Sequence, residues 1–89
     1  MRYIACISLE TATPINGSDP DVRSMLRIPG FIRLERSEDH DGRYKLVFEV
    51  EAGSRRDATD ATDELLVEYE NALSAYRPRL LETASREAR

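Results

Sequence analysis

Hydrophobic residues near the start of the chain occupy both faces of a predicted strand. Residues 3–9, YIACISL, are rich in β-branched and aromatic side chains. Apolar side chains fall on both alternating sets: Tyr3, Ala5, Ile7 and Leu9 on one, Ile4 and Cys6 on the other. Because successive side chains of a strand point to opposite faces, this pattern predicts a central strand or a strand covered on both faces.

A loop and a short helix are predicted next. Residues 10–20, ETATPINGSDP, contain turn-forming Pro, Asn and Gly residues and no apolar period. Asp19 and Pro20 are typical of an N-cap and a first helical residue, because the amide hydrogen that proline lacks would have no partner there. The helix ends before residues 29–30, Pro-Gly, and its apolar face carries Val22, Met25 and Leu26.

Two alternating segments predict an antiparallel hairpin. Residues 31–36, FIRLER, alternate Ile32 and Leu34 with other side chains, and residues 43–51, RYKLVFEVE, are the clearest alternating stretch in the chain. The apolar sets must share one face, because a slip of one residue inverts a strand. The register that satisfies this condition pairs Leu34 with Leu46, Ile32 with Phe48 and Glu35 with Lys45. Glu38 to Gly42 then form the loop, with Gly42 free to take a left-handed conformation.

A long helix is predicted from Asp57 onward, where the apolar period changes to that of a helix. It ends or kinks at residues 77–78, Arg-Pro, because a residue before proline disfavours helical geometry. For residues 78–89 we favour a helical or frayed tail, because Glu82 and Arg86 are four residues apart, although residues 73–83 also fit a fourth strand. The main apolar stripe consists of Ala58, Thr62, Leu65, Tyr69, Ala72 and Tyr76.

Together these elements predict a single α+β domain over residues 1–89. The order of strand, helix, two strands and helix favours a ferredoxin-like or related antiparallel sheet of three or four strands, with two or three helices on one face. The opposite face of such a sheet is bare unless another segment covers it.

Composition narrows the class of protein. The 89 residues are 40% hydrophobic and 34% charged, which is typical of a globular domain, and no apolar run is long enough to span a membrane. The net charge of −4, with no basic block, disfavours nucleic acid as a partner. A single cysteine excludes an intrachain disulfide, and the start of the chain lacks the pattern of a signal peptide. We expect a cytoplasmic protein.

No group of residues in the sequence matches a catalytic, cofactor-binding or metal-binding motif. The turn EDHDG holds the only histidine, His40, but the later oxygen ligands of a calcium loop are missing, and a hairpin tip explains its Asp and Gly residues. Asp57, Asp60 and Asp63 suit the positive end of a helix, and Cys6 fits a buried, inert thiol. We therefore predict no catalytic, cofactor-binding or metal-binding residues and no cofactor.

Two family resemblances follow from these segments. SLETATPINGSDPDV and GRYKLVFEVE, with a later ELL, resemble the small ferredoxin-like subunit of phosphoribosylformylglycinamidine synthase. That resemblance implies a noncatalytic oligomeric adaptor that joins synthase and glutaminase subunits in purine synthesis. IPGFIRLERSEDHDGRYKLVFEVE is similar to dimeric α+β barrels of the antibiotic-biosynthesis-monooxygenase type, which implies a haem or a small aromatic ligand held between helices and sheet.

We therefore expect a noncatalytic interaction module that forms a homodimer or larger oligomer and contacts a protein partner. The first strand is apolar on both faces, and an exposed apolar sheet face usually marks an interface. The predicted interface residues lie on the hairpin face opposite the core: Phe31, Arg33, Lys45, Val47 and Glu49. Two alternatives stay open. One is a small-ligand-binding barrel with polar contacts from Tyr44, Arg33 and His40, and the other is a viral or mobile-element protein that binds a host factor.

Overall fold

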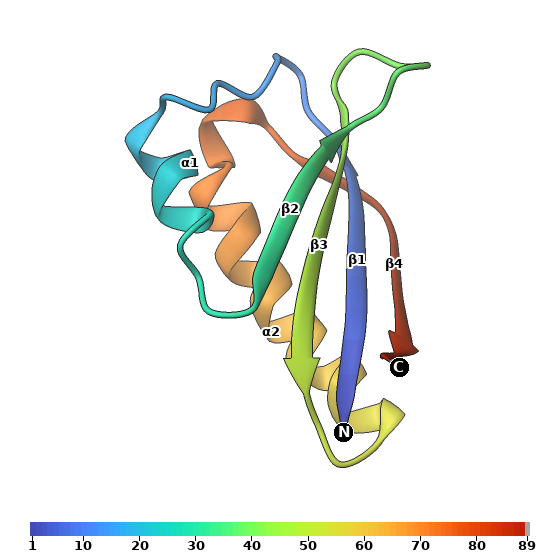
Figure 1. Ribbon diagram of the computed structural model, residues 1–89. Coiled ribbons are helices and arrows are strands. Elements are labelled where there is room, and N and C mark those ends of the chain that lie inside the picture. The colour runs from blue at the N-terminus through green and yellow to red at the C-terminus, as the bar shows by residue number, and fades with distance from the viewer. Residues whose placement is uncertain (89) are drawn as a thin grey trace.

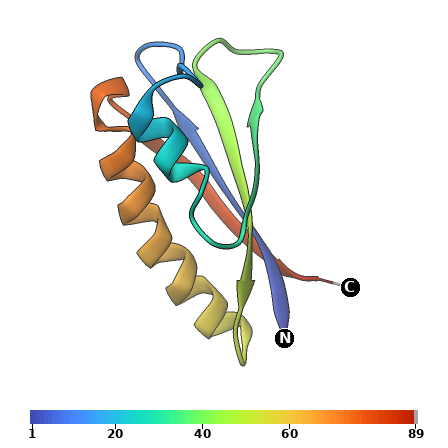
Figure 2. The same cartoon turned by 60° about the vertical axis from the view of Figure 1, so that its left-hand side comes forward.

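The computed structural model describes residues 1–88, which form a four-stranded antiparallel sheet with two α-helices packed on one side of it (Figure 1). The strand order in the sheet is β2-β3-β1-β4, the order of a ferredoxin-like fold, so the predicted fold class is confirmed. Figure 2 shows both helices on one side of the sheet, with no other segment facing them across it. The elements along the chain are β1 Arg2–Glu10, α1 Pro20–Met25, β2 Phe31–Arg36, β3 Arg43–Glu51, α2 Arg55–Ala72, a 3₁₀ turn Ser74–Tyr76 and β4 Arg79–Glu87.

β1 is a central strand, as its apolar pattern predicts. It pairs with β3 on one side and β4 on the other, so both of its edges are hydrogen-bonded. Four of its side chains are buried against the helices: Tyr3, Ala5, Ile7 and Leu9. Its opposite face is only half-buried, because no segment of residues 1–88 covers that side of the sheet.

The C-terminal tail is a strand, so the favoured helix over residues 78–89 is wrong. Arg79–Glu87 pairs with β1 along nearly its whole length, with one irregularity between Ser8 and Leu9. Without this strand the edge of β1 would present unpaired backbone groups, which are costly to leave unsatisfied next to a core. That backbone pairing outweighs the weak helical spacing of Glu82 and Arg86. The segment before the strand turns at Arg77, which has a positive φ of 52°.

The β2–β3 hairpin has the predicted register at one end only. Leu34 lies opposite Leu46 and Glu35 opposite Lys45, as expected. The predicted pairing of Ile32 with Phe48 is wrong, because Phe31 occupies that place and the register shifts between Phe31 and Arg33. A bulge of this kind inserts one extra residue into a strand. It turns the larger Phe31 toward the core and leaves Ile32 43% exposed.

The two helices begin at capped N-termini. The Asp19 side chain accepts a hydrogen bond from the Asp21 amide at 2.9 Å, and the Ser54 hydroxyl accepts one from the Asp57 amide at 3.2 Å. Such caps satisfy amide groups that the helix itself leaves unpaired. α1 buries Val22 and Met25, and α2 starts two residues before the predicted Asp57 and ends at Ala72. The predicted stripe of α2 buries Ala58, Thr62 and Tyr69, while Tyr76 lies in the 3₁₀ turn.

Two tyrosine hydroxyls hold the loop between β1 and α1. The Tyr44 hydroxyl accepts a hydrogen bond from the Ile15 amide at 2.9 Å. The Tyr76 hydroxyl accepts one from the Asn16 amide at 3.3 Å and donates one to Asp19 Oδ2 at 2.8 Å. The hydrogen bond to Asp19 raises the pKa of Tyr76, because an ionised phenol could not donate it. Tyr76 thus ties the end of α2 to the N-cap of α1.

We expect Tyr76→Phe to lower the free energy of unfolding by about 1 kcal/mol, since it removes two hydrogen bonds at a partly exposed site. Tyr69→Phe is the matched control. The Tyr69 hydroxyl is buried with no hydrogen-bond partner among residues 1–88, and burial raises its pKa to about 12. Removing this unsatisfied group should leave stability unchanged or raise it. Urea titration of both variants measures the difference, and an equal loss for the two would contradict the roles assigned to these hydroxyls.

Candidate interaction surface

The sheet face opposite the helices is called the open face here. Directly paired residues of antiparallel strands share a face, so the register gives its cross-strand rows. The central row runs from Arg33 on β2 through Val47 on β3 and Cys6 on β1 to Ala84 on β4. Three of these four side chains are small or apolar, and charged rows lie on both sides of them.

The central row contributes less exposed apolar area than its composition suggests. Val47 is only 3% exposed, between the neighbouring strands that carry Arg33 and Cys6. Cys6 is half-buried and Ala84 is exposed. Leu81, at the irregular part of β4, adds a side chain that is 40% exposed. The row is therefore a shallow apolar band and not a groove.

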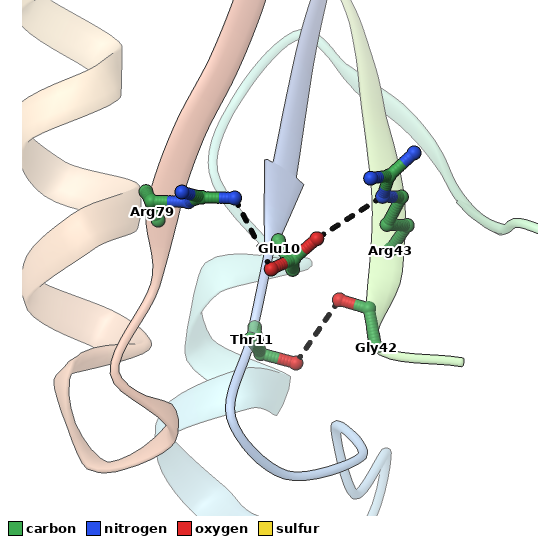
Figure 3. Close-up of polar contacts among 5 residues, drawn as sticks. All are labelled: Glu10, Thr11, Gly42, Arg43 and Arg79. Atoms are coloured by element: carbon green, nitrogen blue, oxygen red, sulfur yellow. Dashed lines mark hydrogen bonds and ion pairs between the residues drawn. The ribbon is translucent and has the colours of Figure 1, made fainter. Parts of the chain in front are cut away.

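One end of the open face carries a row of ion pairs (Figure 3). Glu10 on β1 accepts a hydrogen bond from Arg43 Nε on β3 at 3.1 Å and one from Arg79 Nη2 on β4 at 3.3 Å. The Arg43 hydrogen bond, followed by the charges of both arginines, holds the pKa of Glu10 below its usual value. Because that pKa is lowered in the fold, the stabilising contribution is present near neutral pH and is lost as the pH falls through the lowered value.

Ion pairs also cross the rest of the open face. Arg2 Nη1 lies 3.5 Å from Glu49 Oε1 at the far end, between β1 and β3. Arg33 donates to Glu35 along β2, and this hydrogen bond holds the pKa of Glu35 below its usual value. These side chains are all partly exposed, so each pair contributes little to the stability of the isolated domain. Their charges remain accessible to a partner.

The structure places four of the five predicted interface residues on the open face. Arg33, Lys45, Val47 and Glu49 lie there, on the hairpin strands. Phe31 does not, because the bulge turns it toward Phe48 and it packs against the core. The placement of Phe31 on the bare face is therefore wrong.

The predicted interface residues included none from β1 or β4, although the second apolar face of β1 was taken as a sign of an interface. Ile4 and Cys6 form the second alternating set of β1, which was a visible signal. Ala84 and Leu81 could not be placed there while the tail was assigned to a helix. The β4 part of the open face therefore came only from the structure.

The acidic turn is exposed. Glu38, Asp39, His40 and Asp41 lie at the tip of the hairpin, and Arg36 Nη2 approaches Asp41 Oδ1 at 3.6 Å. Gly42 closes the turn with a φ of 85°, the left-handed conformation that the sequence predicts. Its carbonyl oxygen accepts a hydrogen bond from the Thr11 amide at 2.7 Å. Figure 3 shows the longer hydrogen bond that the same oxygen accepts from the Thr11 hydroxyl. Among residues 1–88, no group of three or more His, Cys, Asp or Glu side chains is arranged to hold a metal ion.

A hollow of about 530 Å³ lies on the open face near the hairpin loop. Its lining includes Arg36, Arg43, Lys45 and Tyr44, together with Glu35 and Glu82. Of the three residues considered as ligand contacts, Tyr44 lines this hollow, whereas Arg33 and His40 do not. On the other side of the sheet, the space beneath the helices is filled by buried apolar side chains.

No family model matches the chain, and a search of curated proteins finds no significant match. Within the part of the chain that the structure describes, neither helix is long and apolar enough to cross a membrane.

Proposed function

We propose that this domain is a noncatalytic interaction module that self-associates through the open face of its sheet. The observation that carries the proposal is the open face, which no segment of residues 1–88 covers: its central row holds the buried Val47, the half-buried Cys6 and the exposed Ala84, and charges of both signs flank it. An apolar band inside a charged rim is the usual anatomy of a protein interface. The near balance of signs on this face suits a second copy of the chain better than a strongly charged partner.

The proposal includes an adaptor role. A dimer that uses its open faces leaves both pairs of helices outward, where they can contact other proteins. The resemblance to the small phosphoribosylformylglycinamidine synthase subunit supports a place in a biosynthetic complex such as that of purine synthesis. A cytoplasmic location agrees with that role and stays a prediction.

Self-association is tested by the mass of the purified chain in solution. We expect light scattering and sedimentation velocity to give twice the chain mass at high micromolar concentration. Val47→Glu should shift the protein to a monomer, because it buries a carboxylate in the centre of the interface. Val67→Glu is the matched control: Val67 is 57% exposed on α2, so the same change there should leave the dimer intact.

Val47 is buried within one copy, so its variant needs a folding check. Thermal unfolding by circular dichroism provides the check, and Ala84→Glu repeats the test at an exposed position of the same row. A wild-type chain that remains a monomer at all concentrations overturns the proposal. Dimers that persist in folded Val47→Glu and Ala84→Glu variants would also overturn it.

A second candidate function is carried by the hollow near the hairpin loop. Its volume is within the range of small-molecule sites, and its lining includes the cationic Arg36, Arg43 and Lys45 together with Glu35 and Glu82. The three cationic groups favour a small anionic compound. Thermal-shift measurements with haem and with aromatic carboxylates test it, and Arg36→Ala should abolish any shift that depends on the hollow.

A further inference from the structure

The charges on β3 change sign about the middle of the open face. Val47 is the central residue of this strand, which runs from Arg43 to Glu51. On the hairpin-loop side of Val47 the open-face residues are the basic Lys45 and Arg43. On the other side they are the acidic Glu49 and Glu51. The strand therefore has a positive half and a negative half of equal length.

β1 and β4 show a reversal of the opposite polarity about the same row, apart from the basic Arg79 at the hairpin-loop end of β4. Cys6 is the central residue of β1, and Ala84 lies opposite it on β4. On each strand, an acidic residue on the hairpin-loop side of the central row has a basic counterpart the same number of residues beyond the row on the other side. These pairs are Glu10 with Arg2 on β1 and Glu82 with Arg86 on β4.

We propose that two copies pack open face to open face about a two-fold axis, an inference that rests on the proposed function. The axis runs perpendicular to the strands, along the central row. This rotation places each strand on its own counterpart in the second copy and exchanges its ends. Lys45 of one copy then lies opposite Glu49 of the second, and Glu82 opposite Arg86. Because a two-fold contact is used twice, every such pair forms twice. Arg33, in the central row, meets its own counterpart and is the like-charged contact of this arrangement.

The other simple two-fold arrangement forms fewer pairs of opposite charges. An axis along the strands would place β2 on β4 and β3 on β1. Glu35 would then meet Glu82 of the second copy, and Lys45 would meet the uncharged Ser8, although Arg43 would meet Glu10 and Arg2 would meet Glu51. Like charges that meet at an interface are costly, and charge complementarity fixes the orientation of partners. The charge pattern therefore selects the axis across the strands.

The dimensions of the sheet are adequate for a reversible dimer. Three strands of nine residues and one of six span roughly 19 Å by up to 30 Å, or about 500 Å² per copy. This area is at the small end of specific interfaces, which predicts a concentration-dependent dimer. Packed sheets cross at about 30°, which displaces the outer charges of β3 more than the inner ones. Lys45 and Glu49, one step from the central row, are therefore the most informative pair.

Charge reversal at this pair tests the orientation. Lys45→Glu makes both positions acidic, and Glu49→Lys makes both basic, so each variant alone should dimerise at least about tenfold more weakly than the wild type. An equimolar mixture should recover the wild-type affinity, because each acidic position of one variant then faces a basic position of the other. The double variant Lys45→Glu/Glu49→Lys should also dimerise. Sedimentation equilibrium measures the affinities, and native mass spectrometry identifies the mixed dimer.

The controls separate this inference from self-association in general. Arg56→Glu and Glu68→Lys make the same charge changes at exposed positions of α2 and should not alter the affinity. Circular dichroism confirms folding, and Glu82→Arg with Arg86→Glu repeats the exchange on exposed positions of β4. If the wild type dimerises but the single variants behave like the controls, the orientation is wrong and the proposed function survives. A wild type that stays monomeric overturns both.

Discussion

Phe48→Ala is expected to lower the free energy of unfolding by about 3–5 kcal/mol, the range measured when a buried aromatic residue is cut to alanine. Phe48 is fully buried at the centre of β3, and its ring meets that of Tyr69 on α2 edge to face, with centroids 5.6 Å apart. The change removes the contact that joins sheet and helix and leaves a cavity. At about 0.05–0.15 kcal/mol per residue, a domain of 89 residues has about 4–13 kcal/mol of stability, so this loss should produce a large fall in the midpoint of urea unfolding.

Variants at two neighbouring positions, Phe31 and Ile32, give losses of stability to compare with that of Phe48→Ala. Phe31, opposite Phe48, is half-buried against the core, so Phe31→Ala should cost less than Phe48→Ala but still a measurable amount. Ile32→Ala should change stability by less than about 1 kcal/mol, because that side chain is exposed. Urea denaturation of the three variants measures the order. A larger loss for Ile32→Ala than for Phe31→Ala would favour the regular register expected from the sequence over the observed bulge.

The difference between these registers shows where sequence patterns are informative. Alternation identified the buried face of β3 and the pairing of Leu34 with Leu46, because burial of one sheet face requires a period of two. The same rule failed at Ile32, since it assumes a strand without bulges. Helical spacing and N-cap residues found both helices for a similar reason: each reflects an interaction within the segment itself.

β4 could not be predicted with the same security. Eight of its nine residues are exposed, so the strand carries no alternating pattern. Its position depends on backbone hydrogen bonds to β1, and these do not depend on side-chain identity. The part of the candidate surface that β4 contributes could not be predicted for the same reason. Lys45 and Glu49 were identified from the hairpin, but the charge reversal across three strands became visible only when Glu82 and Arg86 were placed beside β1.

Gly30→Ala is expected to destabilise the domain by at least about 2 kcal/mol, since strained backbone of this kind costs about 1–3 kcal/mol even before any clash. Gly30 has a φ of 90°, and a Cβ atom there would lie 2.5 Å from the backbone oxygen of Glu49. The Gly30 carbonyl also accepts a hydrogen bond from the Glu49 amide at 2.7 Å. The two chains cannot separate to admit a methyl group without losing this bond at the start of β2.

Gly17→Ala is the matched control for this substitution. Nothing lies within 4 Å of the place its Cβ would take, and its φ is outside the left-handed range. Alanine at such a loop position restricts the unfolded chain, so stability should be unchanged or should rise by up to about 1 kcal/mol. Gly42→Ala should resemble Gly30→Ala, because its Cβ would approach the Thr11 oxygen at 2.8 Å and its φ is 85°. Equal midpoints for Gly17→Ala and Gly30→Ala in urea would show that β2 does not approach β3 this closely in solution.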